Sequence, residues 1–257
     1  MKLAFFLRTL FPSPALLILF LVSPCFSQDA LRLFREMQNA LGGPDKIAAI
    51  GDFQETEVAE TWDNSGHSHG QVRKRTRWMR PSYLRLDQVG PDDTYVLYCD
   101  GRSGWEILPN KTVADLVGGE LKFAQKYLHD FSLNLWLADR DSRYVITSPS
   151  SDVLVIADKD GHEASGSLKI TLDPANFLPL KQTTISLADP SHPTGSETHF
   201  ADWRSIDGVQ FPRAISIFHN GSKLAQITVE QISVNRGIRP EEIAIKPTDL
   251  NPVMPLP

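Results

Sequence analysis

Most of this chain, from about Phe53 to Asn235, consists of short segments in which apolar and polar residues alternate between turn signals such as Asp100-Gly101. Side chains that alternate with a period of two point to opposite faces of a β-strand. Residues 71–80 show this most clearly, with one face made of Val72, Lys74, Thr76 and Trp78 and the other of Arg73, Arg75, Arg77 and Met79. The pattern predicts a mainly β (α+β) protein with antiparallel strands joined by hairpins.

The strand segments follow one another closely enough to build one large sheet. The clearest of them are residues 83–89, 94–99, 105–108, 144–147, 153–157, 167–172, 180–187, 197–204, 209–218 and 223–235. In the last segment the apolar phase changes after Val229, which predicts a β-bulge near Glu230. A sheet of about ten to eleven strands with little helix must curl over something. We therefore expect a half-open antiparallel β-barrel with helices covering its concave face.

Two regions carry helical spacing instead. Near the start, Asp29 is a candidate cap, Gly42-Gly43 is a helix end and Pro44 opens a short second helix. The apolar stripe of the first helix consists of Ala30, Phe34, Met37 and Leu41. In mid-chain, apolar residues recur at steps of three and four from Val117 to Leu135. This spacing predicts an apolar helix over about 119–137, which is the natural cover for the concave face.

The first 27 residues have the features of a signal peptide. Lys2 and Arg8 precede an apolar run of eight residues, 15–22, which is too short to span a bilayer. Ser27 permits cleavage, so we expect a mature chain from about Gln28 that is periplasmic or secreted. A lipid anchor on Cys25 is the less favoured alternative, because a proline precedes it where such signals carry a small residue.

Composition beyond the signal limits the partners. The remaining chain has 24 basic and 31 acidic residues, a net charge of −7, which argues against a nucleic acid partner. No later segment reaches 18 consecutive apolar residues, so we expect no membrane span. Its length suits a single domain over residues 28–250, expected to be a monomer, with a loose Pro-rich tail at 251–257. Cys99 alone survives cleavage, so an internal disulfide is excluded.

Signatures of catalysis and metal binding are weak. Ser103 lies in a Gly-Arg-Ser-Gly turn between strands, without the spacing of a nucleophile elbow. Cys99 has no reactive motif and is expected to be a buried thiol. The polar surroundings of His67 and His69 predict a solvated loop rather than a metal site. We expect no enzyme activity, no cofactor and no metal. The remaining alternative is a hydrolase assembled from distant residues, with a base among His129, His162, His199 and His219.

Large apolar side chains indicate where a ligand would bind. A curled sheet with one helix does not easily close its own interior, and a leftover apolar cavity suits a hydrophobic ligand. Each candidate is also, taken alone, an ordinary core residue. The residues that we expect to line the cavity are Trp78, Leu84, Leu86, Val96, Tyr98, Trp105, Leu121, Leu128, Phe131 and Trp136.

Residues 70–109 resemble the bacterial outer-membrane lipoprotein-carrier (LolA/LolB-like) family, within the wider group of lipoprotein-sorting proteins. The shared pattern is a glycine, an Arg-Pro pair between strands, and a strand that runs into Asp-Gly and a following tryptophan. The matching positions are Gly70, Arg80-Pro81, Leu84 to Leu86, Val96-Leu97, Asp100-Gly101 and Trp105. Two further segments, 41–50 and 200–212, look like parts of secreted bacterial proteins grouped near that family.

The resemblance implies a half-open barrel whose apolar interior accepts acyl chains of lipids or lipoproteins. It also implies that Arg80 holds a helical lid through bonds to helix-terminal carbonyls; the alternative is a solvated arginine at a strand end. The run Arg73, Arg75 and Arg77 has no place in the family pattern. Alternation favours a solvated face for these three, and the alternative is a surface for an acidic partner.

Two functions follow as expectations. The first is an exported envelope carrier that binds lipid or lipoprotein acyl chains in an apolar cavity. The alternative is an envelope sensor or interaction module of the same fold, acting through a protein partner without transport.

Overall fold

The computed structural model of the chain describes residues 25–63, 65–90, 94–159, 165–186 and 194–246. The expected Pro-rich tail and residues 1–24 of the expected signal peptide lie outside the described residues. Helix α1 spans Cys25–Ala40, so the expected mature start at Gln28 falls in its first turn.

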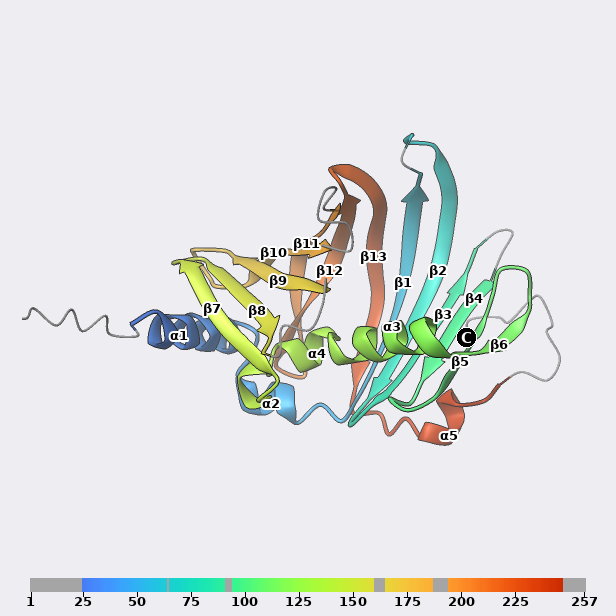
Figure 1. Cartoon of the computed structure of the whole chain (residues 1–257), viewed down its shortest axis with the longest axis horizontal. Coiled ribbons are helices and arrows are strands. Elements are labelled where there is room, and N and C mark those ends of the chain that lie inside the picture. Colours follow the sequence, from blue (N-terminus) through green and yellow to red (C-terminus); the bar gives the residue numbers. More distant parts are fainter. Residues whose placement is uncertain (1–24, 64, 91–93, 160–164, 187–193, 247–257) are drawn as a thin grey trace, which may run out of the picture.

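One antiparallel sheet of thirteen strands dominates the described part of the chain (Figure 1). The prediction of a mainly β, half-open architecture is confirmed, but the expected strand number was too low. Strand β6 has three residues, too few to show alternation, and β1 carries Glu55 and Glu57 on its inner side, which hides the apolar phase. The strands are β1 Asp52–Trp62, β2 Ser68–Met79, β3 Tyr83–Val89, β4 Thr94–Cys99, β5 Gly104–Ile107, β6 Val113–Asp115, β7 Tyr144–Ser150, β8 Val153–Asp158, β9 Ser165–Leu172, β10 Pro179–Ser186, β11 Thr194–Ile206, β12 Val209–His219 and β13 Ser222–Val234.

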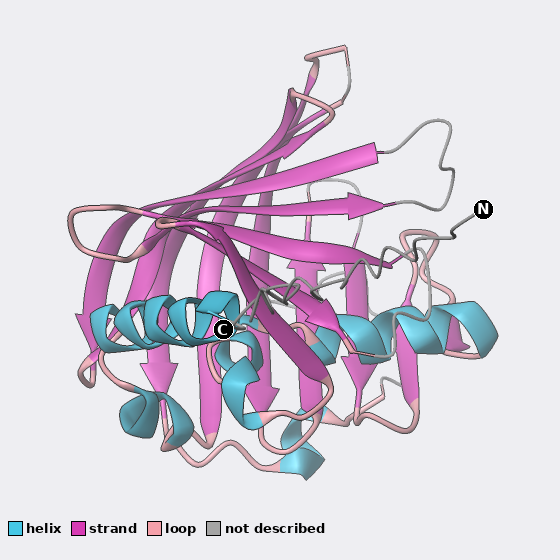
Figure 2. Ribbon diagram, turned by 60° about the vertical axis from the view of Figure 1, so that its left-hand side comes forward, coloured by secondary structure: helices cyan, strands magenta, loops and turns pink. Residues whose placement is uncertain are grey.

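The order of strands across the sheet is β6-β5-β4-β3-β2-β1-β13-β12-β11-β10-β9-β8-β7. Two meanders therefore meet where β1 pairs with β13, and β6 and β7 form the two free edges. The chain passes from one edge to the other through α3 Gly118–His129, α4 Ser132–Leu135 and the 3₁₀ turn η1 Ala138–Arg140. Figure 2 shows the strands curving over the helices. The expected apolar helix at 119–137 is thus present as two helices, α3 and α4.

The first helix is anchored by the predicted stripe, because Ala30, Phe34, Met37 and Leu41 are fully buried. Asp29 lies inside α1 and not at its start, which corrects the expected cap. The buried amide of Gln38 donates to the Trp136 carbonyl and to Asp139 Oδ1, each at 2.9 Å. This glutamine joins α1 to the crossing helices. The short helix α2 spans Pro44–Ala48.

The two faces of the sheet pack separately. Trp78, Leu84, Leu97 and Cys99 belong to the large core that faces the helices. The opposite face carries a smaller cluster beneath α5, Pro240–Ile243, formed by Met79, Val96, Tyr98, Trp105, Ile107 and Ile243. Along β1 the pairing steps from Thr56–Gln231 to Glu57–Val229 and omits Glu230, so the predicted bulge is confirmed.

The segments 41–50 and 200–212, singled out separately in the sequence, meet in space. Gly42 has a φ of +117°, and a Cβ there would overlap the carbonyl oxygen of Gly208 in the β11–β12 hairpin. The Gln210 amide donates to the Leu41 carbonyl at 2.8 Å. Only glycine permits this backbone approach, which holds the α1–α2 turn on the sheet.

Gly42→Ala should therefore lower stability much more than Gly43→Ala. Both positions have positive φ, but a Cβ at Gly43, where φ is +102°, meets nothing within 4 Å. We expect strain of about 1–3 kcal/mol at either position, with the overlap adding to it only at Gly42. Chemical denaturation of the two variants measures the difference. Equal losses would show that the approach to Gly208 contributes nothing.

Candidate functional site

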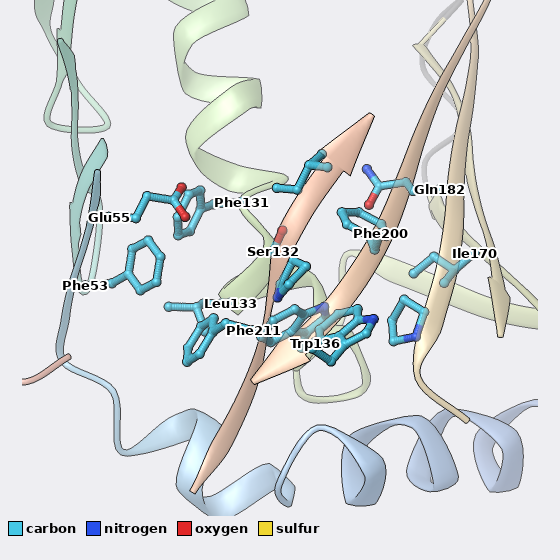
Figure 3. Close-up of a pocket in the computed structure, with 14 residues that line it drawn as sticks. Phe53, Glu55, Phe131, Ser132, Leu133, Trp136, Ile170, Gln182, Phe200 and Phe211 are labelled. Atoms are coloured by element: carbon cyan, nitrogen blue, oxygen red, sulfur yellow. The ribbon is translucent and has the colours of Figure 1, made fainter. Parts of the chain in front are cut away.

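An apolar pocket lies between the crossing helices and the second meander (Figure 3). Its volume is about 90 Å³. The start of α4 and its flanks supply Phe131, Ser132, Leu133 and Trp136, and β1 supplies Phe53 and Glu55. The other lining residues come from β9 to β12 and are Ile170, Pro179, Gln182, Phe200, Trp203, Phe211, Pro212 and Ile215.

Aromatic rings in mutual contact form the wall of this pocket. Phe53 lies 5.7 Å from Phe131 and 5.4 Å from Phe211, measured between ring centroids. Trp136 lies 5.8 Å from Phe211 and 6.4 Å from Trp203. Tilted and edge-on rings at these separations attract one another. The wall is therefore held by packing between residues far apart in the sequence.

The pocket continues into a larger groove beside α3, with a volume of about 550 Å³. Six residues line both spaces: Glu55, Phe131, Ser132, Gln182, Phe200 and Ile215. Phe123 and Tyr127 of α3 border the groove and are 69 % and 43 % exposed. Ligand sites commonly enclose roughly 300–1,000 Å³, so the two spaces together have the size of such a site. The interior is open on this side.

Charged groups lie on the β1–β2 wall of the groove. Glu57 and Lys74 form a buried ion pair at 2.6 Å. Burial alone would lower the pKa of Lys74, but the negative charge of Glu57 raises it above its usual value. Burial raises the pKa of the neighbouring Glu55 to about 8, with the charge of Glu57 adding to the effect and that of Lys74 opposing it. Glu55 is therefore mainly protonated at neutral pH.

The structure separates the residues expected to line the cavity. Phe131 and Trp136 line the pocket, and Trp78 stacks on Phe131 from within the core at 5.4 Å. Leu84 is fully buried in that core, and Leu86 and Leu121 pack against it. Leu128 is core as well and borders a different groove next to Arg80.

Val96, Tyr98 and Trp105 lie on the opposite face of the sheet, away from the pocket. The expectation placed them on the wrong side because β4 is apolar on both faces, and alternation alone does not say which face is concave. Sequence reasoning missed the other lining residues, which are the apolar Phe53, Leu133, Ile170, Pro179, Phe200, Trp203, Phe211, Pro212 and Ile215 and the polar Glu55, Ser132 and Gln182. The alternating apolar residues of segment 209–218 were the available signal.

Arg80 does reach helix-terminal carbonyls, but not those of the crossing helices. Its Nε donates to the Ile50 carbonyl at 3.0 Å and an Nη to the Ile47 carbonyl at 3.5 Å. The guanidinium lies over the Trp78 ring, 5.0 Å from its centroid. Burial, aided by the charge of Arg140, lowers the pKa of Arg80. Arg80 thus holds α2 and the following turn against the core.

The three arginines of β2 do not share one solvated face. Arg73 is exposed and paired with Glu230 at 2.7 Å. Arg75 and Arg77, each 12 % exposed, bind the buried Asp87 at 3.3 and 2.6 Å. Both interpretations of the run as an exposed surface are therefore wrong for these two.

A third arginine completes the Asp87 cluster. Arg85 binds Asp87 at 2.8 Å and donates to the carbonyls of Ile243 and Ile245, which ties α5 to the sheet. Burial would raise the pKa of Asp87, but Arg85 and Arg77 outweigh it, and the pKa lies below its usual value. The Asp87 cluster therefore holds residues 243–245 against the sheet.

Asp87→Asn should destabilise the protein by about 3–5 kcal/mol, because it leaves buried guanidinium groups without their counter-ion. Glu230→Gln, which removes the exposed partner of Arg73, is the control and should cost less than about 1 kcal/mol. Denaturation at pH 7 compares the two variants. Similar small losses of stability in both variants would mean that the arginines find other partners and that the Asp87 cluster contributes little to stability.

The residues considered for catalysis are placed as follows. Ser103 closes the β4–β5 hairpin with Asp100, and Cys99 is fully buried, which raises the pKa of its thiol. His129 stacks on Tyr144, and His199 bonds to Glu197 at 3.0 Å. Within the described ranges, neither histidine is hydrogen-bonded to a serine. His162 lies outside them.

The described residues hold no group of three or more His, Cys, Asp or Glu side chains placed to bind a metal ion. None of their helices has the length and apolar character needed to cross a membrane.

No family model and no curated protein matches the sequence. Solved structures do match. A LolA superfamily protein from Nitrosomonas europaea aligns with a TM-score of 0.57 and 13 % identity, covering 84 % of this chain and 97 % of that one. An outer membrane lipoprotein-sorting protein domain from Vibrio parahaemolyticus gives 0.54 and 13 % over the same shares.

A DUF1329 family protein from Desulfovibrio piger gives a TM-score of 0.57 and 10 % identity, covering 82 % of this chain and 95 % of that one. Identities this low establish the architecture alone. The chain has the LolA-like fold.

Proposed function

We propose, from the LolA-like fold and the open space inside it, that this protein is an exported carrier that binds acyl chains of a lipid or lipoprotein. The observation that carries the proposal is the aromatic pocket, which opens at one end into the groove beside α3. Moving one methylene from water into an apolar site contributes about 0.8 kcal/mol. An acyl chain that enters the pocket therefore gains affinity with each added carbon.

The exposed aromatic residues of α3 support this proposal. Phe123 and Tyr127 border the groove, and an acyl chain lying there would cover them. Apolar side chains gathered at the rim of an open groove are typical of a binding surface. In this proposal the narrow pocket receives the end of the chain and the groove receives the rest.

The location belongs to the proposal as well. The sequence features of residues 1–27 support export, and the Vibrio parahaemolyticus structure is described as an outer membrane lipoprotein-sorting protein domain. A periplasmic or secreted single domain over residues 28–250, acting as a monomer and without catalysis, fits both. The alternative, a module that acts through a protein partner, keeps only Arg73 as an exposed arginine of the expected contact face, because Arg75 and Arg77 are mostly buried against Asp87.

Gln182→Trp should block acyl binding, because residue 182 faces both the pocket and the groove. Thr183→Trp is the matched control, since the next residue of β10 points to the opposite face. We expect displacement of a fluorescent fatty acid to weaken at least tenfold in the first variant and to stay unchanged in the second.

Native mass spectrometry of the wild-type protein, isolated from cell envelopes, should also detect bound acyl species. Circular dichroism confirms that each variant is folded. A folded wild-type protein that takes up no acyl compound would refute the proposal.

A further inference from the structure

Glu55 occupies a special position in the binding space. It lines both the aromatic pocket and the groove, and no other titratable residue of the described chain lines the pocket. Figure 3 shows Glu55 next to Phe131 and across the pocket from the Gln182 amide. A polar group where an apolar pocket meets an open groove is placed to meet the head of a ligand whose chain fills the pocket.

The charges around Glu55 are already paired with one another. Glu57 holds Lys74 at 2.6 Å, and Lys126 of α3 holds Asp130 at 2.6 Å. The described residues supply neither a hydrogen bond nor an ion pair to the Glu55 carboxyl. An ionised Glu55 would add an uncompensated negative charge to this wall, and the neutral acid leaves the wall without net charge. The other titratable groups facing the groove are Tyr127, Tyr144 and Asp158.

The protonated acid is a hydrogen-bond donor that the fold itself leaves unused. It has one O–H group to give, and the Gln182 amide across the pocket has two N–H groups. A carbonyl oxygen accepts such bonds without bringing charge into an apolar site. An ester or amide carbonyl at the head of an acyl chain therefore matches this wall in both polarity and charge.

We infer that Glu55, as the neutral acid, recognises the cargo by donating a hydrogen bond to the carbonyl oxygen of a neutral acyl ester or amide, and that its ionisation weakens the complex. The inference rests on the proposed acyl-binding function and adds the chemical class of the head group. It makes Glu55 a residue that determines specificity.

The direction of the pH effect follows from the state of the carboxyl. The pKa of Glu55 lies at about 8, so at pH 6.5 the group is a donor and at pH 9.5 it is a carboxylate. The carboxylate has no proton to donate and repels the carbonyl oxygen. A neutral ester should therefore bind more tightly at the lower pH, and a long-chain amine, which is a cation, should show the opposite trend.

The test measures binding of monolauroylglycerol and of dodecylamine by calorimetry at pH 6.5 and 9.5. For the wild-type protein, we expect the affinity for the ester to fall at least tenfold at the higher pH. Glu55→Gln keeps an N–H donor and cannot ionise, so its affinity should change less than twofold. Glu60→Gln, at an exposed position of the same strand, should behave like the wild-type protein.

The outcomes separate the two proposals. The role of Glu55 is overturned if the affinity of the wild-type protein for the ester is the same at both pH values, or if it falls equally in Glu55→Gln. Either result leaves the acyl-binding function intact. Amine binding at pH 9.5 that exceeds ester binding at pH 6.5 shows that Glu55 selects cations and also overturns it. Failure of the folded wild-type protein to bind either compound at either pH refutes the acyl-binding function, and the inference falls with it.

Thermal denaturation provides a readout that needs no ligand. The pKa of Glu55 in the folded protein is raised to about 8, above the value of 4.5 of an unperturbed glutamate. The contribution of the neutral Glu55 to folding stability is therefore fully present below pH 4.5 and is lost as the pH rises towards 8. The melting temperature of the wild-type protein should therefore fall relative to that of Glu55→Gln between pH 5 and pH 8. A constant difference would show that Glu55 ionises normally and would overturn the inference.

Discussion

The interior of this protein depends on the crossing of the chain from one edge of the sheet to the other. An open, curled sheet leaves a concave apolar face that must be covered, and β6 and β7 lie at opposite edges. The helices α3 and α4 make that crossing and provide the cover. Gln38 fixes their end to α1, and Phe131 packs on Trp78 at their middle. The helices fill part of the concave side with core residues, and the space that they leave is the candidate site.

The filling is uneven, and this unevenness creates the candidate site. Towards β1 to β4, the concave side is occupied by Trp78, Leu84 and Leu128. Towards β9 to β12, Trp203 and Phe211 meet Trp136 at the end of α4, and these rings line the pocket that remains. Because the space widens towards α3 and gains Glu57 and Lys74 there, it runs from an apolar end to a polar one. That gradient suits an amphipathic molecule with its chain inside and its head outside.

The convex face of the sheet is also covered by a helix, which explains several differences from the structure expected from the sequence. The helix α5 covers Val96, Tyr98 and Trp105, and the Asp87 cluster holds it there through Arg85. A strand covered on both faces is apolar on both faces, as β4 is. On the same face, Arg75 and Arg77 are mostly buried because they bind Asp87. The proposed binding site therefore lies on the concave side, and the convex side carries the contacts that hold α5.

Local patterns determined much of the architecture. The segments 83–89 and 94–99 were predicted with the bounds that the structure has, as were the bulge at Glu230 and the buried stripe of α1. Each follows from neighbours along the chain or across one strand pair. Only the tertiary structure decided which face of β4 is concave, that β2 arginines are buried on Asp87, and that Phe53 and Glu55 share a pocket with Phe200 and Phe211. The reason is that periodicity tells which side chains share a face, whereas the partner that covers the face comes from a distant part of the chain.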